Sequence, residues 1–164
     1  MTDFERLLKT LAERRVECIL IGGVAATAHG SSRLTQDIDV VYSRSSENID
    51  RLVEAIVGLH PYPRGAPPGL PFRWDRPTIE RGLNFPLTTD VGDLDLFGEI
   101  VGGGAYEDLL PHTLKIQPFG VECLCLDLEF LIRVKRAAGR PKDLEAIAEL
   151  EAILQEHDAG GRDP

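Results

Sequence analysis

The hydrophobic and polar positions of the chain follow two periods. Apolar residues spaced by three and four positions predict helices, and short apolar runs between turn residues predict strands. The predicted helices cover residues 3–15, 24–30, 46–58, 105–110, 127–138 and 141–155, with one or two helical turns at 75–81. The predicted strands cover residues 16–21, 37–42, 83–87, 94–100, 114–118 and 121–126, and the last two form a hairpin.

One segment interrupts this order, because residues 59–77 hold six of the eleven prolines. Proline has no backbone N–H and a fixed φ, so the segment cannot be a continuous helix or a central strand. We expect a surface excursion with a short strand at residues 70–74, which is poorly ordered or covers a cleft.

The length of 164 residues favours a single domain. We expect it to span residues 1–157, with a core at 1–126, C-terminal helices at 127–157 and a disordered tail at 158–164. The last predicted helix would bury one stripe of side chains, made of Leu144, Ile147, Ala148, Leu150 and Leu154.

Composition narrows the class of function. No apolar run reaches about 18 residues, so we expect no transmembrane helix, and the first residues lack the layout of a signal peptide. Three cysteines in apolar surroundings favour buried thiols, so we expect a cytoplasmic protein. The net charge of -9 argues against a protein that grips long double-stranded DNA, because neutralised phosphates supply most of that affinity. Basic residues at 14–15 and 133–142 are compatible with a small nucleotide or one RNA end.

Two aspartates share one face of a predicted strand. In the run DIDVVY, alternation puts Asp37 and Asp39 on one face and Ile38 and Val40 on the core face. Two close carboxylates repel each other unless a cation lies between them. Oxygen ligands at this spacing suit Mg²⁺ or Mn²⁺, which bind carboxylates together with substrate phosphates. A solvent-facing pair on an edge strand is the alternative.

The strand before this pair ends in Gly22-Gly23. Backbone N–H groups at the start of the next helix, with no Cβ in the way, are typical of a phosphate site. A tight turn would also explain the glycines. The combination of Gly-Gly, thirteen further residues and then Asp-apolar-Asp on the next strand favours the phosphate site.

The stretch of residues 21–40 (IGGVAATAHGSSRLTQDIDV) resembles the signature of the DNA polymerase β-like nucleotidyltransferase superfamily. In that superfamily a Gly-Gly or Gly-Ser turn precedes an Asp-x-Asp strand, and a later strand supplies a third carboxylate. The stretch is most similar to small bacterial members, including the abortive-infection toxin branch. The matching residues are Gly22, Gly23, Ala25, His29, Gly30, Arg33, Thr35, Asp37 and Asp39. Residues 131–147 also resemble the ending of such proteins.

This resemblance implies an α/β fold of the nucleotidyltransferase type, in which helices flank a mixed, mostly antiparallel sheet. It also implies a catalytic Mg²⁺ or Mn²⁺ site of Asp37, Asp39 and a third acid. The sequence offers Asp90, Asp93 and Asp95 for the third position. Asp95 is favoured because its apolar neighbours would face the core, and Asp93 is the alternative.

The nucleotide would lie against Gly22, Gly23, Arg33 and Thr35. Arg33 could hold phosphate oxygens with its fork, or pair with a surface carboxylate. Thr35 would orient the strand of Asp37, and we expect His29 to be a packed or helix-end residue. Four basic residues could line the far wall of the cleft or form a solvated helix face: Lys135, Arg136, Arg140 and Lys142.

These features predict a metal-dependent nucleotidyltransferase, which moves a nucleoside monophosphate from a nucleoside triphosphate to an acceptor. The acceptor is open: a small molecule, a protein side chain or an RNA 3′ end such as that of tRNA. Resemblance to the toxin branch implies a partner or antitoxin protein. The alternative is a catalytically inactive relative that binds a nucleotide or a partner. Val24 favours this alternative, because many members have a phosphate-binding serine at that position.

Overall fold

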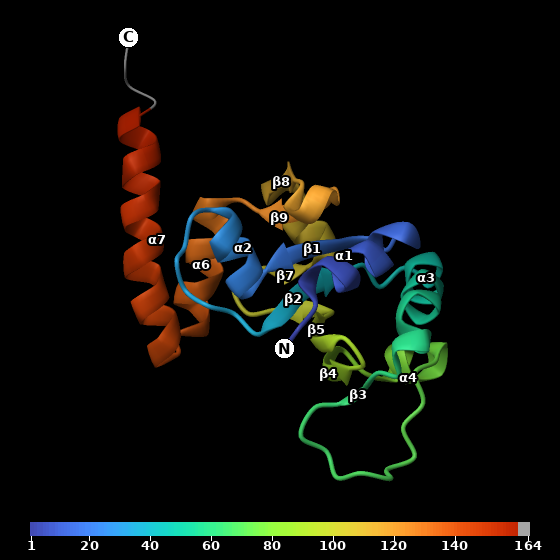
Figure 1. Cartoon of the computed structure of the whole chain (residues 1–164). Coiled ribbons are helices and arrows are strands. Elements are labelled where there is room, and N and C mark those ends of the chain that lie inside the picture. Colours follow the sequence, from blue (N-terminus) through green and yellow to red (C-terminus); the bar gives the residue numbers. More distant parts are fainter. Residues whose placement is uncertain (161–164) are drawn as a thin grey trace.

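The computed structural model describes residues 1–160 of the chain (Figure 1). Its helices are α1 (Phe4–Glu13), α2 (Gly22–Ala28), α3 (Ser46–Ile56), α4 (Arg76–Arg81), α5 (Tyr106–Leu109), α6 (Leu128–Ala138) and α7 (Pro141–Gly160). Its strands are β1 (Cys18–Ile21), β2 (Asp37–Tyr42), β3 (Tyr62–Pro63), β4 (Asn84–Thr89), β5 (Gly92–Phe97), β6 (Glu99–Ile100), β7 (Gly104–Ala105), β8 (Thr113–Ile116) and β9 (Cys123–Leu126). Short 3-10 helices lie at η1 (Val57–Leu59), η2 (Leu110–His112) and η3 (Pro118–Gly120).

Seven strands form one sheet in the order β3-β4-β5-β2-β1-β9-β8, so β3 and β8 are its edges. β2 pairs in parallel with β5, and β1 pairs in parallel with β9. The other four strand pairs are antiparallel. The sheet is therefore mixed, mostly antiparallel and flanked by helices, which confirms the predicted fold class (Figure 1).

The helices α2, α6 and α7 pack in series beside the central strands. α2 packs on β1 and β2, and it also contacts α6, which in turn packs along α7. In Figure 1, α6 and α7 stand together at one side of the molecule, and α3 and α4 lie at the other. None of the helices within residues 1–160 is long and apolar enough to cross a bilayer.

Side-chain caps decide where four of the helices begin. Asp3, Ser45, Asp75 and Asp127 each accept a hydrogen bond from a backbone N–H of the first turn. These caps satisfy N–H groups that have no partner inside the helix. Gly139 follows α6 in the left-handed region, with a φ of 65°, so the helix ends at residue 138 as predicted.

The proline-rich segment differs from the prediction. Residues 70–74 are not a strand; instead Tyr62 and Pro63 form the edge strand β3 against β4. Trp74 is buried, and its ring makes an edge contact with Phe85, with centroids 5.7 Å apart. Burial of this aromatic ring anchors the segment, and its remaining residues are mostly exposed or half-buried.

The last helix also differs from the prediction. α7 continues to Gly160, and residues 161–164 of the expected tail lie outside the described part of the chain. Leu144 was expected in the buried stripe, but it is 59% exposed. Ile147 and Leu150 are buried as predicted, but Ala148 is exposed like Leu144, because the buried face includes the residues just before these two positions. The buried residues of α7 are Asp143, Ala146, Ile147 and Leu150.

Candidate active site

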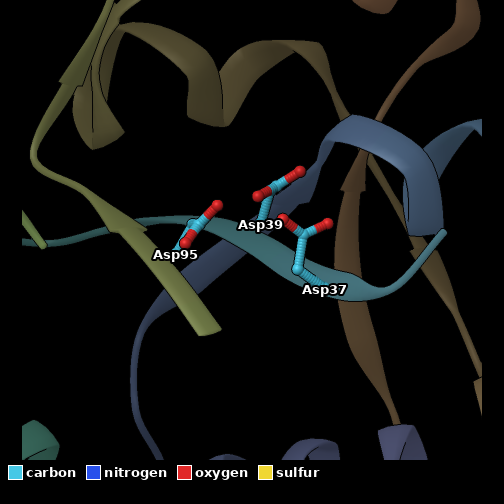
Figure 2. A group of neighbouring side chains, drawn as sticks. All are labelled: Asp37, Asp39 and Asp95. Atoms are coloured by element: carbon cyan, nitrogen blue, oxygen red, sulfur yellow. The ribbon is translucent and has the colours of Figure 1, made fainter. Parts of the chain in front are cut away.

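Two neighbouring strands bring three carboxylates together. β2 carries Asp37 and Asp39, and β5 carries Asp95, which is the register partner of Asp39. One carboxylate oxygen from each residue lies within 4.8 Å of the other two. Figure 2 shows the three side chains directed toward a common volume. The structure therefore assembles the carboxylate triad that the sequence analysis favoured.

The burial of the intervening residues explains this shared face. Ile38 and Leu94 are register partners, and both are completely buried. Val40 and Leu96, the next pair on that face, are 1% exposed. Because side chains alternate along a strand, the aspartates between them must project from the opposite face.

The other two acidic candidates lie outside this triad. Asp93 is the register partner of Asp37, and its carboxylate accepts a hydrogen bond from Thr88 Oγ1 at 2.7 Å. Asp90 lies near the turn between β4 and β5, where its Oδ2 is 2.6 Å from His60 Nδ1. Asp95 is thus the third acid that the geometry supports.

The carboxylates make each other harder to ionise. The pKa of Asp39 is raised to about 8, first by burial and then by the charges of Asp37 and Asp95. Burial and Asp95 also raise the pKa of Asp37, whereas Arg64 and a hydrogen bond from Thr35 oppose that shift. A bound cation would relieve this repulsion.

Close packing explains the two glycines at the start of α2. A Cβ on Gly22 would lie 2.1 Å from Asp39 Oδ2, and Gly22 has a φ of +66°. A Cβ on Gly23 would lie 2.6 Å from Thr35 Oγ1. Side chains at these positions would therefore displace the carboxylate and the threonine that borders it.

A cleft of about 540 Å³ lies against the triad. This volume falls within the range of pockets for small molecules, about 300–1,000 Å³. The central strands and the start of α2 contribute Gly22, Gly23, Asp37, Asp39 and Asp95 to its lining. Three basic residues line it near the junction of α6 and α7: Lys135, Arg140 and Lys142.

The remaining predicted residues have diverse surroundings. Arg33 lines the cleft, and its Nη2 is 3.6 Å from Glu145 Oε2, so it pairs with a nearby carboxylate in this structure. Thr35 Oγ1 donates to the backbone oxygen of Asp37 at 3.1 Å, which agrees with a role in orienting that strand. His29 is the C-cap of α2, and its Nε2 lies 2.7 Å from the Leu126 carbonyl oxygen, as expected for a helix-end residue.

The basic residues divide into two groups. Lys135 is half-buried in the cleft, and burial lowers its pKa against the raising effects of Asp143 and Asp39. Arg136 points elsewhere and forms an ion pair with Glu151. Only part of the predicted basic set therefore faces the cleft.

Sequence reasoning missed two residues at the site. Asp143 is 2% exposed, and its Oδ2 accepts a hydrogen bond from Arg140 Nε at 2.7 Å. Arg64, in the proline-rich segment, lies 2.6 Å from Asp95 through Nη2. Asp143 had a usable signal in the sequence, because it lies four positions before Ile147 and therefore on the same face of the predicted helix. Arg64 has no local signal, because its contact depends on the pairing of β3 with β4.

No protein-family model matches this chain, and no curated protein matches it. Several solved structures are similar to this chain. A Thermotoga maritima protein with a provisional nucleotidyltransferase assignment has a TM-score of 0.55 at 15% identity, with 95% of this chain and 96% of that chain covered. This chain has the nucleotidyltransferase fold.

Two further solved structures share the fold. An antigenic nucleotidyltransferase-like protein from Paracoccidioides brasiliensis has a TM-score of 0.54 at 16% identity, covering 92% of this chain and 73% of that chain. ANT(2″)-Ia in complex with adenylyl-2″-tobramycin has a TM-score of 0.50 at 14% identity, with 94% of both chains covered. At these identities, the likeness extends to the fold alone.

Proposed function

We propose that this chain is a metal-dependent nucleotidyltransferase, which transfers a nucleoside monophosphate from a nucleoside triphosphate to a hydroxyl group. The observation that carries the proposal is the convergence of Asp37, Asp39 and Asp95 at a cleft that also holds Lys135 and Arg140. The nucleotidyltransferase fold supports it, because a site of this composition on this fold suits nucleotide chemistry. The complex of ANT(2″)-Ia with an adenylylated product is compatible with such a transfer.

The donor atoms of the triad fit Mg²⁺ or Mn²⁺. All are carboxylate oxygens, the ligands that both ions prefer, and they lie close enough to share a cation. When bound, such an ion neutralises charge on the triphosphate and on the leaving pyrophosphate. Asp37 and Asp39 would hold it on the triphosphate, and Asp95 would complete a second metal position.

The protein side chains would then orient the transfer. Asp95 would act as the general base that takes the proton of the acceptor hydroxyl. Alternatively, as a ligand of the second metal position it would help to lower the pKa of that hydroxyl, whose proton then passes to water. The hydroxyl oxygen bonds to the α-phosphorus while the bond from that phosphorus to the bridging oxygen of the β-phosphate breaks. Lys135 and Arg140 stabilise the charge on the phosphates, and Asp143 holds Arg140 in position. Gly22, Gly23, Arg33 and Thr35 would border the nucleotide.

The first test is pyrophosphate release from ATP, GTP, CTP or UTP with Mg²⁺ or Mn²⁺. We expect Asp95→Asn to lower release by about 100-fold or more, because losing a metal ligand should exceed the 10–100-fold loss typical of an outer partner. Asp90→Asn is the matched control, since Asp90 is exposed and pairs with His60. Equal rates for Asp95→Asn and the wild type would contradict the assignment of the third acid.

A second test concerns the basic part of the cleft. Lys135→Met should raise the KM for the nucleoside triphosphate by about 10- to 100-fold, because charge-assisted contacts contribute about 1.5–3 kcal/mol. Arg136→Met removes a charge one residue away but outside the cleft lining, so its KM should match the wild type. Steady-state kinetics measure both, and equal effects of the two substitutions would argue for general surface charge.

The second candidate function is nucleotide binding without catalysis. Val24 favours it, because this side chain has no hydroxyl for a phosphate and packs against the hydrophobic core. Metal-dependent nucleotide binding without pyrophosphate release, over a broad set of hydroxyl acceptors, would support this candidate.

The proposal leaves three classes of acceptor open: a small molecule, a protein side chain or a tRNA 3′ end. We also propose the toxin of a toxin–antitoxin pair as a special case, from the resemblance of residues 21–40. Growth arrest on expression, abolished by Asp39→Asn and relieved by a neighbouring gene, would support it. Growth that is unaffected by expression would exclude the toxin role and would not contradict the transferase proposal.

A further inference from the structure

We propose that Arg64 is a positioning residue, which fixes the carboxylate of Asp95 for metal binding. This inference rests on the proposed function, because it assigns a role toward the same metal site. Arg64 directly follows β3 and reaches past β4 to the acidic face of β5. It is the cation that the proline-rich segment contributes to the triad.

The guanidinium of Arg64 contacts three carboxylates with three different nitrogens. Nη2 lies 2.6 Å from Asp95 Oδ1, and Nε lies 3.4 Å from Asp93 Oδ2. Nη1 lies 3.9 Å from Asp37 Oδ2. Arg64 therefore borders the triad beside Asp95, and the side of the triad at Asp39 faces the cleft.

The backbone of β4 holds Arg64 independently of the acids. Its Nη2 donates a hydrogen bond to the Leu87 carbonyl oxygen at 2.8 Å. Its own N–H donates to the Pro86 carbonyl oxygen at 2.9 Å, next to the pairing of Pro63 with Leu87. These bonds attach both the backbone and the guanidinium of Arg64 to β4. The guanidinium is therefore held in place and does not occupy the position of a metal ion.

The environment makes this ion pair stronger than an exposed one. The side chains of Arg64 and Asp95 are 31% and 15% exposed. Arg64 Nε and Asp95 Oδ1 are both enclosed and have no well-aligned hydrogen bond within residues 1–160. Each lies instead at ion-pair distance from an opposite charge: Nε from Asp93 and Asp95 Oδ1 from Arg64 Nη2. Exposed pairs contribute little because water screens them, and that screening is reduced here.

A carboxylate has two oxygens, so Arg64 can hold Asp95 by one while the other remains available as a ligand. Partners of this kind orient metal ligands, and their loss typically lowers metal affinity or activity by about 10- to 100-fold. Lysine is not equivalent, because it lacks the rigid fork that spans two acids. Without the arginine, Asp95 would lose its fixed orientation and Asp93 would lose its cation.

The test measures Mn²⁺ binding by the full chain without nucleotide, using titration calorimetry and electron paramagnetic resonance. We expect Arg64→Met to raise the Mn²⁺ dissociation constant by about 10- to 100-fold, and Arg64→Lys to give an intermediate value. Arg73→Met is the matched control, because Arg73 is an exposed arginine of the same segment, and it should bind like the wild type. Circular dichroism checks folding, and Arg64→Lys carries the test if Arg64→Met fails to fold.

Unchanged Mn²⁺ affinity in the Arg64 variants would overturn the inference. Higher affinity would also overturn it, because it would mean that the arginine competes with the ion. Wild-type Mn²⁺ binding without pyrophosphate release would refute the transferase proposal and leave the positioning role standing. A wild type that binds no Mn²⁺ would remove the metal site and this role together.

Discussion

Asp39→Asn is expected to abolish metal binding, to lower nucleotidyl transfer by about 100-fold or more, and to stabilise the metal-free protein at alkaline pH. The pKa of Asp39 is raised from 3.8 to about 8, first by burial and then by Asp37 and Asp95. A raised pKa means that the folded state favours the protonated form. The resulting stabilisation is complete below pH 3.8 and is lost as the pH rises through about 8. Asparagine does not titrate, so the variant escapes this loss.

Thermal unfolding at pH 5 and pH 9, with a chelator and with Mn²⁺ plus nucleoside triphosphate, measures these effects. In chelator, the melting temperature of the wild type should fall between pH 5 and pH 9 by more than that of Asp39→Asn. Mn²⁺ with nucleotide should raise the melting temperature of the wild type and leave that of Asp39→Asn unchanged. Asp90→Asn lies outside the triad and should follow the wild type throughout. A metal-induced shift that is equal in wild type and Asp39→Asn would contradict a site at this carboxylate.

Gly22→Ala is expected to damage both stability and metal binding. Alanine at a φ of +66° costs about 1–2 kcal/mol from backbone strain alone. Its Cβ would also lie 2.1 Å from Asp39 Oδ2, so the carboxylate or the start of α2 must move. In chelator, we expect the free energy of unfolding to fall by at least this strain energy. We also expect Mn²⁺ affinity and nucleotidyl transfer to fall together.

Gly69→Ala separates the two effects of that substitution. Gly69 also has a left-handed φ, +88°, but no atom lies within 4 Å of the position of an added Cβ. It should therefore lose comparable stability from strain and keep wild-type Mn²⁺ affinity. Equal loss of affinity in both variants would show that strain, and not contact with Asp39, weakens the site.

The parts of the site that were predictable depend on local periodicity. Alternation along single strands placed Asp37, Asp39 and Asp95 on the faces opposite buried residues. That reasoning uses only the order of neighbouring residues, so it did not require knowledge of strand pairing. The resemblance of residues 21–40 then supplied the fold that brings the two strands together.

The parts that were missed depend on tertiary pairing. Arg64 reaches the triad because two residues pair as β3 with β4, and a pair of residues is too short to show a strand period. Leu144 was placed in the core because an apolar residue at helical spacing usually faces it. Asp143 occupies that face instead, because its charge is satisfied by Arg140.

The two edges of the seven-stranded sheet have a consequence for self-association. β3 is only two residues long and contains Pro63, which cannot donate a hydrogen bond to an incoming strand. β8 has four residues, among them Lys115, whose side chain is 73% exposed. Short edges with proline and lysine resist the addition of a strand from another molecule, which is the first step of ordered aggregation. The net charge of -9 adds repulsion between copies, so concentrated solutions of this protein should remain free of fibrils.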